Sequence, residues 1–249
     1  MGVDIMVLHF TWLPAMTARD LQRTLADMGD DAIAAHSARF FKTGPGEYGE
    51  GDVFRGIRVG PLRRVARQCR GLPIDEALTL LASEWHEDRL LALIILVDTF
   101  KRGDSATQRV IYNAYLSNTD RVNNWDLVDA SAHKIVGPFL HHRSRSRLYV
   151  LAGSASLWER RIAIIATLYF IRLGEFVDTL AIAKILVTDP EPLIHKAVGW
   201  MLREVGKRDL AAEEGFLMRH YRSMPRTMLR YAIERFPEPR RRAYLKGEV

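Results

Sequence analysis

The sequence predicts an all-α protein built as an α-solenoid, a superhelix of HEAT-like helical repeats, and two observations carry that prediction. Apolar residues recur at i, i+3 and i+4 along most of the chain, with almost no alternation of period two. Five helical segments also recur at intervals of about 35 residues, which is typical of helix pairs that bury their apolar faces only against their neighbours. We therefore expect residues 1–249 to form a single domain of stacked helix pairs.

Short connectors separate the predicted helices. The first helix begins after Thr17, whose hydroxyl suits an N-cap, so Met16 is an alternative start and residues 1–15 are a possible N-terminal extension. The clearest later helical patterns cover residues 75–83, 88–100, 160–172 and 195–207. Gly, Asp and Pro are frequent in the connectors at residues 101–105, 172–176, 187–192 and 206–209. Links this short favour antiparallel neighbours.

The repeats share a register at the start of one helix in each unit. The segments compared are EDRLLAL, NNWDLVD, ERRIAII, IHKAVGW and LRYAIER. Their alignment brings together Arg89, Trp125, Arg161, Lys196 and Arg230, at spacings of 36, 36, 35 and 34 residues. Four of these five residues are basic, so we expect equivalent helices to present their first turns to one concave, positively charged surface.

Most of the excess positive charge lies in the C-terminal half of the chain. The formal net charge is +6; residues 1–142 hold 16 Lys and Arg against 18 Asp and Glu, whereas residues 143–249 hold 20 against 12. A basic half of this kind is a reasonable footprint for nucleic acid, although many basic proteins never bind it. Charge alone therefore leaves nucleic-acid binding as one hypothesis among several.

Cysteine, histidine and hydropathy narrow the class of protein. Cys69 is the single cysteine, which excludes an internal disulfide and a multi-cysteine metal site and fits a reducing compartment. The eight histidines show no metal-ligand spacing, so we expect no metal. No segment reaches the roughly 18 apolar residues of a membrane span. We expect a cytoplasmic protein that acts without a membrane.

The segment NNWDLVD, residues 123–129, breaks the basic register. Trp125 and Asp129 lie four residues apart and share a helix face, and Lys196 and Trp200 repeat that geometry two units later. We expect a carboxylate and two indoles to border the basic groove. The ordinary alternative is that the tryptophans are core residues and the aspartate a helix cap. Because a carboxylate repels phosphate, one inside the groove would serve chemistry or pair with Arg161.

Two further segments are candidates for DNA contact. The glycine-rich stretch from Lys42 to Asp52 has no preceding strand, and its acidic residues would repel phosphate, so we interpret it as a flexible interhelical loop. Tyr48 within it is a possible DNA contact. The run from Arg143 to Arg147 is either a backbone contact or an exposed loop, and the sequence does not separate these alternatives.

From residue 40 onward the chain resembles the DNA alkylation repair enzyme family, the AlkD-like DNA glycosylases built from HEAT-like repeats. Several segments carry the resemblance in the same order, and together they make it specific. They are FFKTGPGEYGEGDVFRGIRV (40–59), WHEDRLLALIILV (85–97), NNWDLVD (123–129), LWERRIAIIATLYFIR (157–172), LIHKAVGWMLREVGKRD (193–209) and MPRTMLRYAIERF (224–236).

The resemblance implies excision of N3- or N7-alkylated purines from duplex DNA by hydrolysis of the N-glycosidic bond, without metal or cofactor and from the backbone side. The positions that match the family's active-site residues are Trp125, Asp129, Arg161 and Trp200. Arg203 matches a DNA-contacting arginine, and the repeat register adds Arg89, Lys196 and Arg230 as candidate DNA contacts. The chain departs from the family's usual pattern at Arg55, where relatives often have an apolar residue. Arg160 lies beside Arg161, and the sequence leaves open which of the two arginines faces the DNA.

The residue types suit this chemistry independently of the resemblance. An alkylated purine is already cationic, so it can leave without a general acid, and a carboxylate near C1′ stabilises the oxocarbenium character of the transition state. We assign this role to Asp129 and expect Arg161 to keep it ionised by lowering its pKa while also holding a phosphate. We expect the protein to be a monomer. The alternative to an enzyme is a catalytically silent relative that binds DNA or a protein through the same solenoid.

Overall fold

The computed structural model describes residues 16–249 and confirms the predicted fold class. Within that range helices are the regular elements, apart from one isolated β-bridge between Val53 and Trp85. The first helix begins after Thr17, whose side chain accepts a hydrogen bond from the backbone N–H of Asp20, as expected of an N-cap. The possible N-terminal extension, residues 1–15, lies outside the described residues. Within the described residues, no helix is both long and apolar enough to cross a membrane.

The helices follow one another through short connectors, except for the longer loop after α2. They are α1 (Ala18–Asp27), α2 (Asp31–Phe40), α3 (Val59–Gln68), α4 (Ile74–Leu81), α5 (His86–Arg102), α6 (Ser105–Ser117), α7 (Trp125–Phe139), α8 (Ser146–Ala152), α9 (Leu157–Ala166), α10 (Leu168–Arg172), α11 (Val177–Ile185), α12 (Pro192–Gly206), α13 (Leu210–His220), α14 (Arg226–Ala232) and α15 (Glu238–Lys246), with a 3₁₀ turn at Ile233–Arg235.

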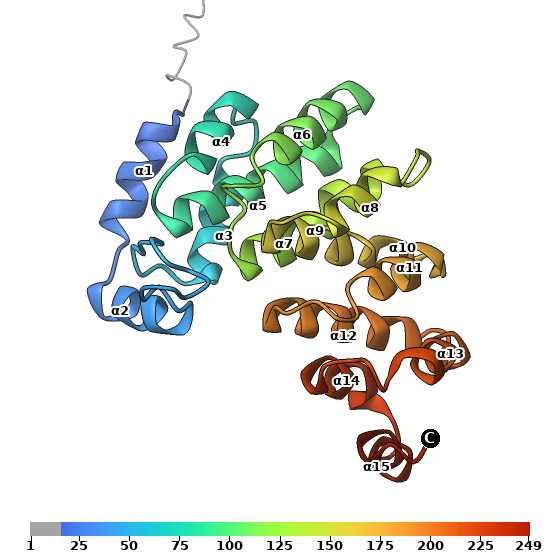
Figure 1. The fold of residues 1–249 in the computed structure, drawn as a ribbon. Coiled ribbons are helices and arrows are strands. Elements are labelled where there is room, and N and C mark those ends of the chain that lie inside the picture. Colours follow the sequence, from blue (N-terminus) through green and yellow to red (C-terminus); the bar gives the residue numbers. More distant parts are fainter. Residues whose placement is uncertain (1–15) are drawn as a thin grey trace, which may run out of the picture.

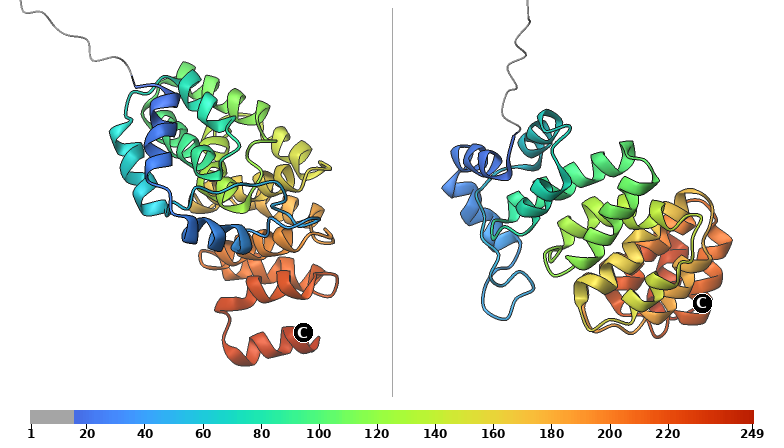
Figure 2. Two further views of the ribbon diagram at one scale, coloured as in Figure 1. Left: turned by 90° about the vertical axis from the view of Figure 1, so that its left-hand side faces the viewer. Right: turned by 90° about the horizontal axis from the view of Figure 1, so that it is seen from above.

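Two layers of helices form the solenoid (Figure 1). In the inner layer, helices α5, α7, α9, α12 and α14 stack in chain order, each against the next. In the outer layer, α4, α6, α8, α11 and α13 each contact an inner helix. The two views in Figure 2 show α1–α3 and the loop after α2 at one end of this stack and α15 at the other. The inner layer therefore presents the first turns of successive helices along one side.

Two glycines allow neighbouring inner helices to approach closely. A Cβ at Gly137 would lie 2.5 Å from the carbonyl oxygen of Ala166, and a Cβ at Gly199 would lie 2.4 Å from that of Met228. Any side chain at these positions would push the helices apart, because protein interiors hold few voids into which neighbours can move. Gly199 directly precedes Trp200, so this contact also sets the position of that indole.

The loop between α2 and α3 is anchored to α5 where it leads into α3. At its end, the Glu87 carboxylate on α5 accepts hydrogen bonds from the backbone N–H groups of Arg55, Gly56 and Ile57 at 2.8, 2.9 and 3.1 Å. Asp88 pairs with the Arg55 guanidinium at 2.7 Å. Both carboxylates are buried. Buried polar groups need such partners, so the first turn of α5 fixes this segment in place.

Candidate functional site

A cavity of about 500 Å³ opens at the first turns of the inner helices, and it brings together six of the residues singled out in the sequence. These are Trp125, Asp129, Arg161, Lys196, Trp200 and Arg203. Its remaining lining includes residues that the sequence did not assign to the site or assigned only weakly. They are Phe40, Lys42, Tyr48, Glu191, Pro192, Leu193 and Tyr231.

Asp129 and Arg161 form a two-point ion pair at the cavity wall. The Nε and Nη2 groups of Arg161 donate to the two carboxylate oxygens of Asp129 at 3.0 and 2.8 Å. Arg161 is buried, whereas the Asp129 side chain keeps 18% of its surface exposed. The Nη1 group of Arg161 donates to the carbonyl oxygen of Leu193 on α12 at 2.5 Å. The pair therefore joins α7, α9 and α12 and leaves one face of the carboxylate open.

The pKa of Asp129 differs from the sequence-based expectation. Burial raises this pKa above its ordinary value, and the Arg161 guanidinium opposes the shift without cancelling it. Arg161 acts in the expected direction, but the carboxylate loses so much hydration at the cavity wall that the net shift is upward. The two-point contact still favours the ionised form, since both oxygens accept hydrogen bonds from a permanent cation.

Both tryptophans reach the cavity. Trp125 is the first residue of α7, where the Asn124 side chain accepts a hydrogen bond from its backbone N–H at 2.8 Å. Its indole stacks on Phe41 with ring centroids 5.4 Å apart, and the exposed Phe40 ring meets it edge-on at 6.0 Å. Trp200 is also partly exposed, and its Nε1 donates to Glu204 at 3.3 Å. The interpretation of these residues as core side chains is therefore not supported.

Arg89 and Arg230 do not occupy the places predicted for them as DNA contacts. Arg89 is 3% exposed and donates to Asp52 at 2.6 Å, so its guanidinium is enclosed by the protein and that prediction was wrong. Arg230 is exposed but does not line the cavity; Tyr231 does. The register fails by one residue here, because a spacing of 35 from Lys196 leads to Tyr231, the third residue of LRYAIER.

The remaining predicted cations differ in their availability. Lys196 is exposed at the cavity. Arg203 lines the cavity and pairs with Glu234 on the 3₁₀ turn. Arg161, with its hydrogen bonds made inside the protein, is better placed to hold Asp129 than to hold a phosphate. Its neighbour Arg160 faces elsewhere and pairs with Asp189 at 2.6 Å, which settles the competition between the two arginines.

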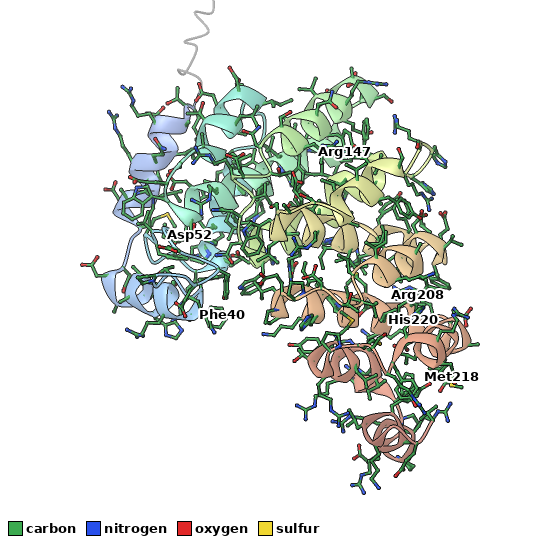
Figure 3. All side chains as sticks on the ribbon, viewed as in Figure 1. Phe40, Asp52, Arg147, Arg208, Met218 and His220 are labelled. Carbon is green, nitrogen blue, oxygen red and sulfur yellow. The ribbon has the colours of Figure 1, made fainter. Side chains whose placement is uncertain are left out.

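The arginine run before α8 belongs largely to the scaffold. Arg145 pairs with Glu175 and, at 2.6 Å, with Asp178. Arg147 is exposed, and Figure 3 places it near α6 and α8, well away from Phe40 at the cavity mouth. This arrangement favours an exposed segment at the outer layer over a DNA backbone contact, and Arg147 itself lies in α8 rather than in a loop.

A second hollow of about 590 Å³ adjoins the first and shares Trp125 and Asp129 with it. Its cationic lining, which the sequence analysis missed, consists of Arg63, Arg67, Arg70 and Lys134. The signal was present, since the three arginines stand at intervals of four and three residues on or just after α3. Burial and the nearby charges of Arg63 and Arg172 lower the pKa of Lys134. Asp98, Asp126 and Asp129 also line this hollow, so its four cations exceed its acids by one. A net positive lining of this kind favours an anionic ligand.

Among residues 16–249, no cluster of three or more His, Cys, Asp or Glu side chains forms a potential metal site. The functional groups at the two hollows are therefore carboxylate, guanidinium, ammonium, phenol and indole. These groups can bind a polyanion, contact cationic or aromatic rings and place one carboxylate beside a reacting centre.

The family model for the DNA alkylation repair enzyme matches residues 21–236, which is most of the chain. The protein belongs to the DNA alkylation repair enzyme family. A solved structure described as a predicted DNA alkylation repair enzyme from Enterococcus faecalis has the same fold, with a TM-score of 0.65 and 17% sequence identity. The match covers 84% of this chain and 97% of that one. No curated protein sequence matches the chain. As a family member, this protein is expected to act on DNA.

Proposed function

We propose that this family member is a DNA glycosylase that hydrolyses the N-glycosidic bond of cationic N3- or N7-alkylated purines, such as 3-methyladenine and 7-methylguanine, in duplex DNA. One observation carries the proposal: the Asp129 carboxylate opens on a cavity between two indoles while Arg161 holds it from behind. A carboxylate in that setting would hinder simple DNA binding, because it repels phosphate. Its position is easier to explain by chemistry at a cationic centre.

The reaction needs little from the protein beyond this carboxylate. As the bond from C1′ to the purine nitrogen breaks, its electron pair neutralises the positive charge of the base, so no acid is required. C1′ gains oxocarbenium character, which Asp129 stabilises electrostatically. A water molecule then forms the new bond to C1′ and gives its proton to Asp129 or to solvent. Arg161 acts as a positioning residue, because it fixes the carboxylate without needing to touch the substrate.

The aromatic residues favour cationic substrates. A cation near the face of an indole gains roughly 0.5 to 2 kcal/mol, depending on desolvation. Trp125 and Trp200 line the cavity from α7 and α12 and can supply this contact to the charged base or the developing sugar cation. Normal purines carry no such charge, so the indoles add to the discrimination that leaving-group chemistry already provides.

DNA contacts come from both hollows. Lys196 and Arg203 line the first hollow, and the basic hollow between α3, α5 and α7 adds Arg63, Arg67 and Lys134. Phosphate contacts of this kind position the duplex without reading its sequence. We further propose that the protein is a single-domain, monomeric, cytoplasmic enzyme that uses neither metal nor cofactor.

The test is release of free 3-methyladenine and 7-methylguanine from methylated duplex DNA. Wild-type protein should release both bases, and Asp129→Asn should lower the rate by about 10²- to 10³-fold, the cost of removing one electrostatic stabiliser of a transition state. DNA binding by the variant should persist. Asp120→Asn is the matched control, because Asp120 is an exposed aspartate outside both hollows.

Two outcomes would count against the proposal. Equal release by wild type and Asp129→Asn would remove the carboxylate from the mechanism. A folded wild type that binds DNA and releases no base would instead identify a catalytically silent binding module.

A further inference from the structure

A buried chain of charged groups connects the glycine-rich loop to the first turn of α7. The Nδ1 atom of His86, the first residue of α5, lies 3.3 Å from Asp52 at the end of the loop. Its Nε2 atom lies 2.9 Å from Asp126, which is next to Trp125 on α7. His86 is 2% exposed and stacks on Phe54 with ring centroids 4.7 Å apart. The imidazole is therefore the bridge between two elements that both line the site.

Other groups support this bridge from each neighbouring element. Arg89 on α5 donates to Asp52 at 2.6 Å, and Asn124, the N-cap of α7, donates to the same carboxylate at 2.9 Å. Glu87, beside His86, is occupied by backbone N–H groups of residues 55–57. His36 and Arg58 line the adjoining hollow with His86, and neither makes an ion pair with it. The groups that face the imidazole directly are the carboxylates of Asp52 and Asp126.

The charges balance only when His86 is protonated. Two carboxylates then face one imidazolium and the Arg89 guanidinium, whereas a neutral imidazole would leave an uncompensated negative charge inside the protein. Burial alone would lower the pKa of His86, but its hydrogen bonds to Asp126 and Asp52 raise it to about 9. The same network holds the pKa of Asp52 below its ordinary value, against the opposing effect of burial. Both shifts agree with the geometry.

The loop that this network holds carries two cavity residues. Lys42 and Tyr48 lie in it and line the cavity together with Lys196 and Trp200. Within the loop, the backbone N–H of Gly49 donates to the carbonyl oxygen of Lys42 at 3.0 Å. Hydrogen bonds inside the loop therefore connect the residues before Asp52 to the network of charged groups around His86. A shift at Asp52 would move this cavity wall relative to Trp125 and Asp129.

We propose that His86 is a positioning residue whose charged imidazole, bridging Asp52 and Asp126, holds the 42–52 loop against the first turn of α7 and sets the width of the site. This rests on the proposed glycosylase function for its effect on rate. The effect on the loop is independent of that function. Because folding raises the pKa of His86 from 6.5 to about 9, the contribution of this charged bridge to stability is fully present below pH 6.5 and is lost as the pH rises through about 9.

Hydrogen exchange of the loop amides tests the structural part. In Asp126→Asn the imidazole loses one of its two carboxylates, so its pKa should fall by about 1 to 3 units. At pH 5 the loop of this variant should exchange at the wild-type rate; at pH 8 it should exchange faster, measured against residues 143–147 as an internal reference. His86→Gln should exchange faster at both pH values. A purely structural hydrogen bond predicts the same difference at both.

Base release tests the functional part. The alkaline limb of kcat should lie near pH 9 in the wild type, move down by about 1 to 3 units in Asp126→Asn, and be absent in His86→Gln, whose kcat falls about 10- to 100-fold. His141→Gln is the control, because His141 meets Glu175 far from the site. An alkaline limb that stays in place and loop exchange that ignores pH would overturn the proposal. Absent base release with the expected exchange pattern would overturn only the glycosylase function.

Discussion

Arg89 and Arg161 stand in equivalent registers of different repeats, and each is buried against an aspartate. Arg89 is 3% exposed and meets Asp52 at 2.6 Å; Arg161 is 4% exposed and meets Asp129 at 2.8 Å. The difference lies in the acid. The Asp52 side chain is 4% exposed, whereas that of Asp129 is 18% exposed and opens on a cavity.

The comparison shows how one repeat position serves two purposes. Where neighbouring elements enclose the carboxylate, as α5 and the start of α7 enclose Asp52, the ion pair stabilises the scaffold. Where the groove leaves the carboxylate uncovered, the same ion pair presents a reactive group. Both pairs contain an arginine and both arginines are buried, so neither the residue type nor its burial distinguishes the two cases.

The largest expected effect is a difference in the free energy of unfolding between variants of the two ion pairs. Arg89→Met should reduce the free energy of unfolding by about 3–5 kcal/mol, because Asp52 would remain buried without its guanidinium. Arg161→Met should cost less, since water in the cavity can solvate Asp129. Urea unfolding followed by circular dichroism measures both. A larger loss for Arg161→Met would show that the covered pair is not the more structural one.

Lowering the pH should affect the two ion pairs differently, with protonation of Asp129 reducing activity and protonation of Asp52 reducing stability. The lowered pKa of Asp52 gives a stability contribution that is present above pH 3.8 and lost as the pH falls below it. The pKa of Asp129 is raised, so this residue takes up its proton above pH 3.8, while the fold is intact. Base release should therefore fall at a higher pH than helicity does. Protein-free DNA at each pH corrects for spontaneous depurination, and coincident losses would contradict the expectation.

Replacement of the indoles should have a smaller effect. Trp125→Phe and Trp200→Phe should each weaken the preference for a cationic lesion by roughly 0.5 to 2 kcal/mol. Trp158→Phe is the control, because Trp158 lines neither hollow. Competition between methylated and neutral-lesion duplexes gives the ratio of kcat/KM values. An unchanged ratio in both variants would assign selectivity to leaving-group chemistry alone.

The smallest effect concerns the basic hollow. Arg63→Gln and Arg67→Gln should each reduce the slope of log K against log salt by about 1 for DNA binding, with little dependence on the lesion. Arg147→Gln on the outer layer should leave the slope unchanged. Fluorescence anisotropy at several salt concentrations provides these slopes. Equal slopes for the hollow variants and wild type would place the duplex elsewhere.

The sequence was sufficient for much of the fold and part of the site. The helical period and the 35-residue repeat predicted the solenoid. Residues four apart on α7 and on α12 were predicted to share a helix face at the groove, and both pairs line the cavity. Periodicity follows from local geometry, which the order of residues specifies.

Other features depend on contacts between distant segments, which no period reports. Arg89 follows the repeat register, yet the loop that covers it is a long insertion outside the repeat. The pKa of Asp129 depends on how much water its wall excludes, and spacing says nothing about that. The repeat register pointed to Arg230, whereas the third position of LRYAIER, which is equivalent to Lys196 in IHKAVGW, is Tyr231.

The hydrogen bond from Asn124 to Asp52 joins residues 72 positions apart. In an ideal solenoid each unit interacts only with its nearest neighbours, so stability behaves as a one-dimensional sum and terminal units can fray separately. This bond links the segment ahead of α3 to the start of α7. The stability of these units therefore also depends on a contact between units that are not nearest neighbours. Heat should therefore melt the part from α1 to α7 in one cooperative step. The units from α13 to α15 can open earlier, because the ion pair between Arg240 and Glu214 joins residues only 26 positions apart.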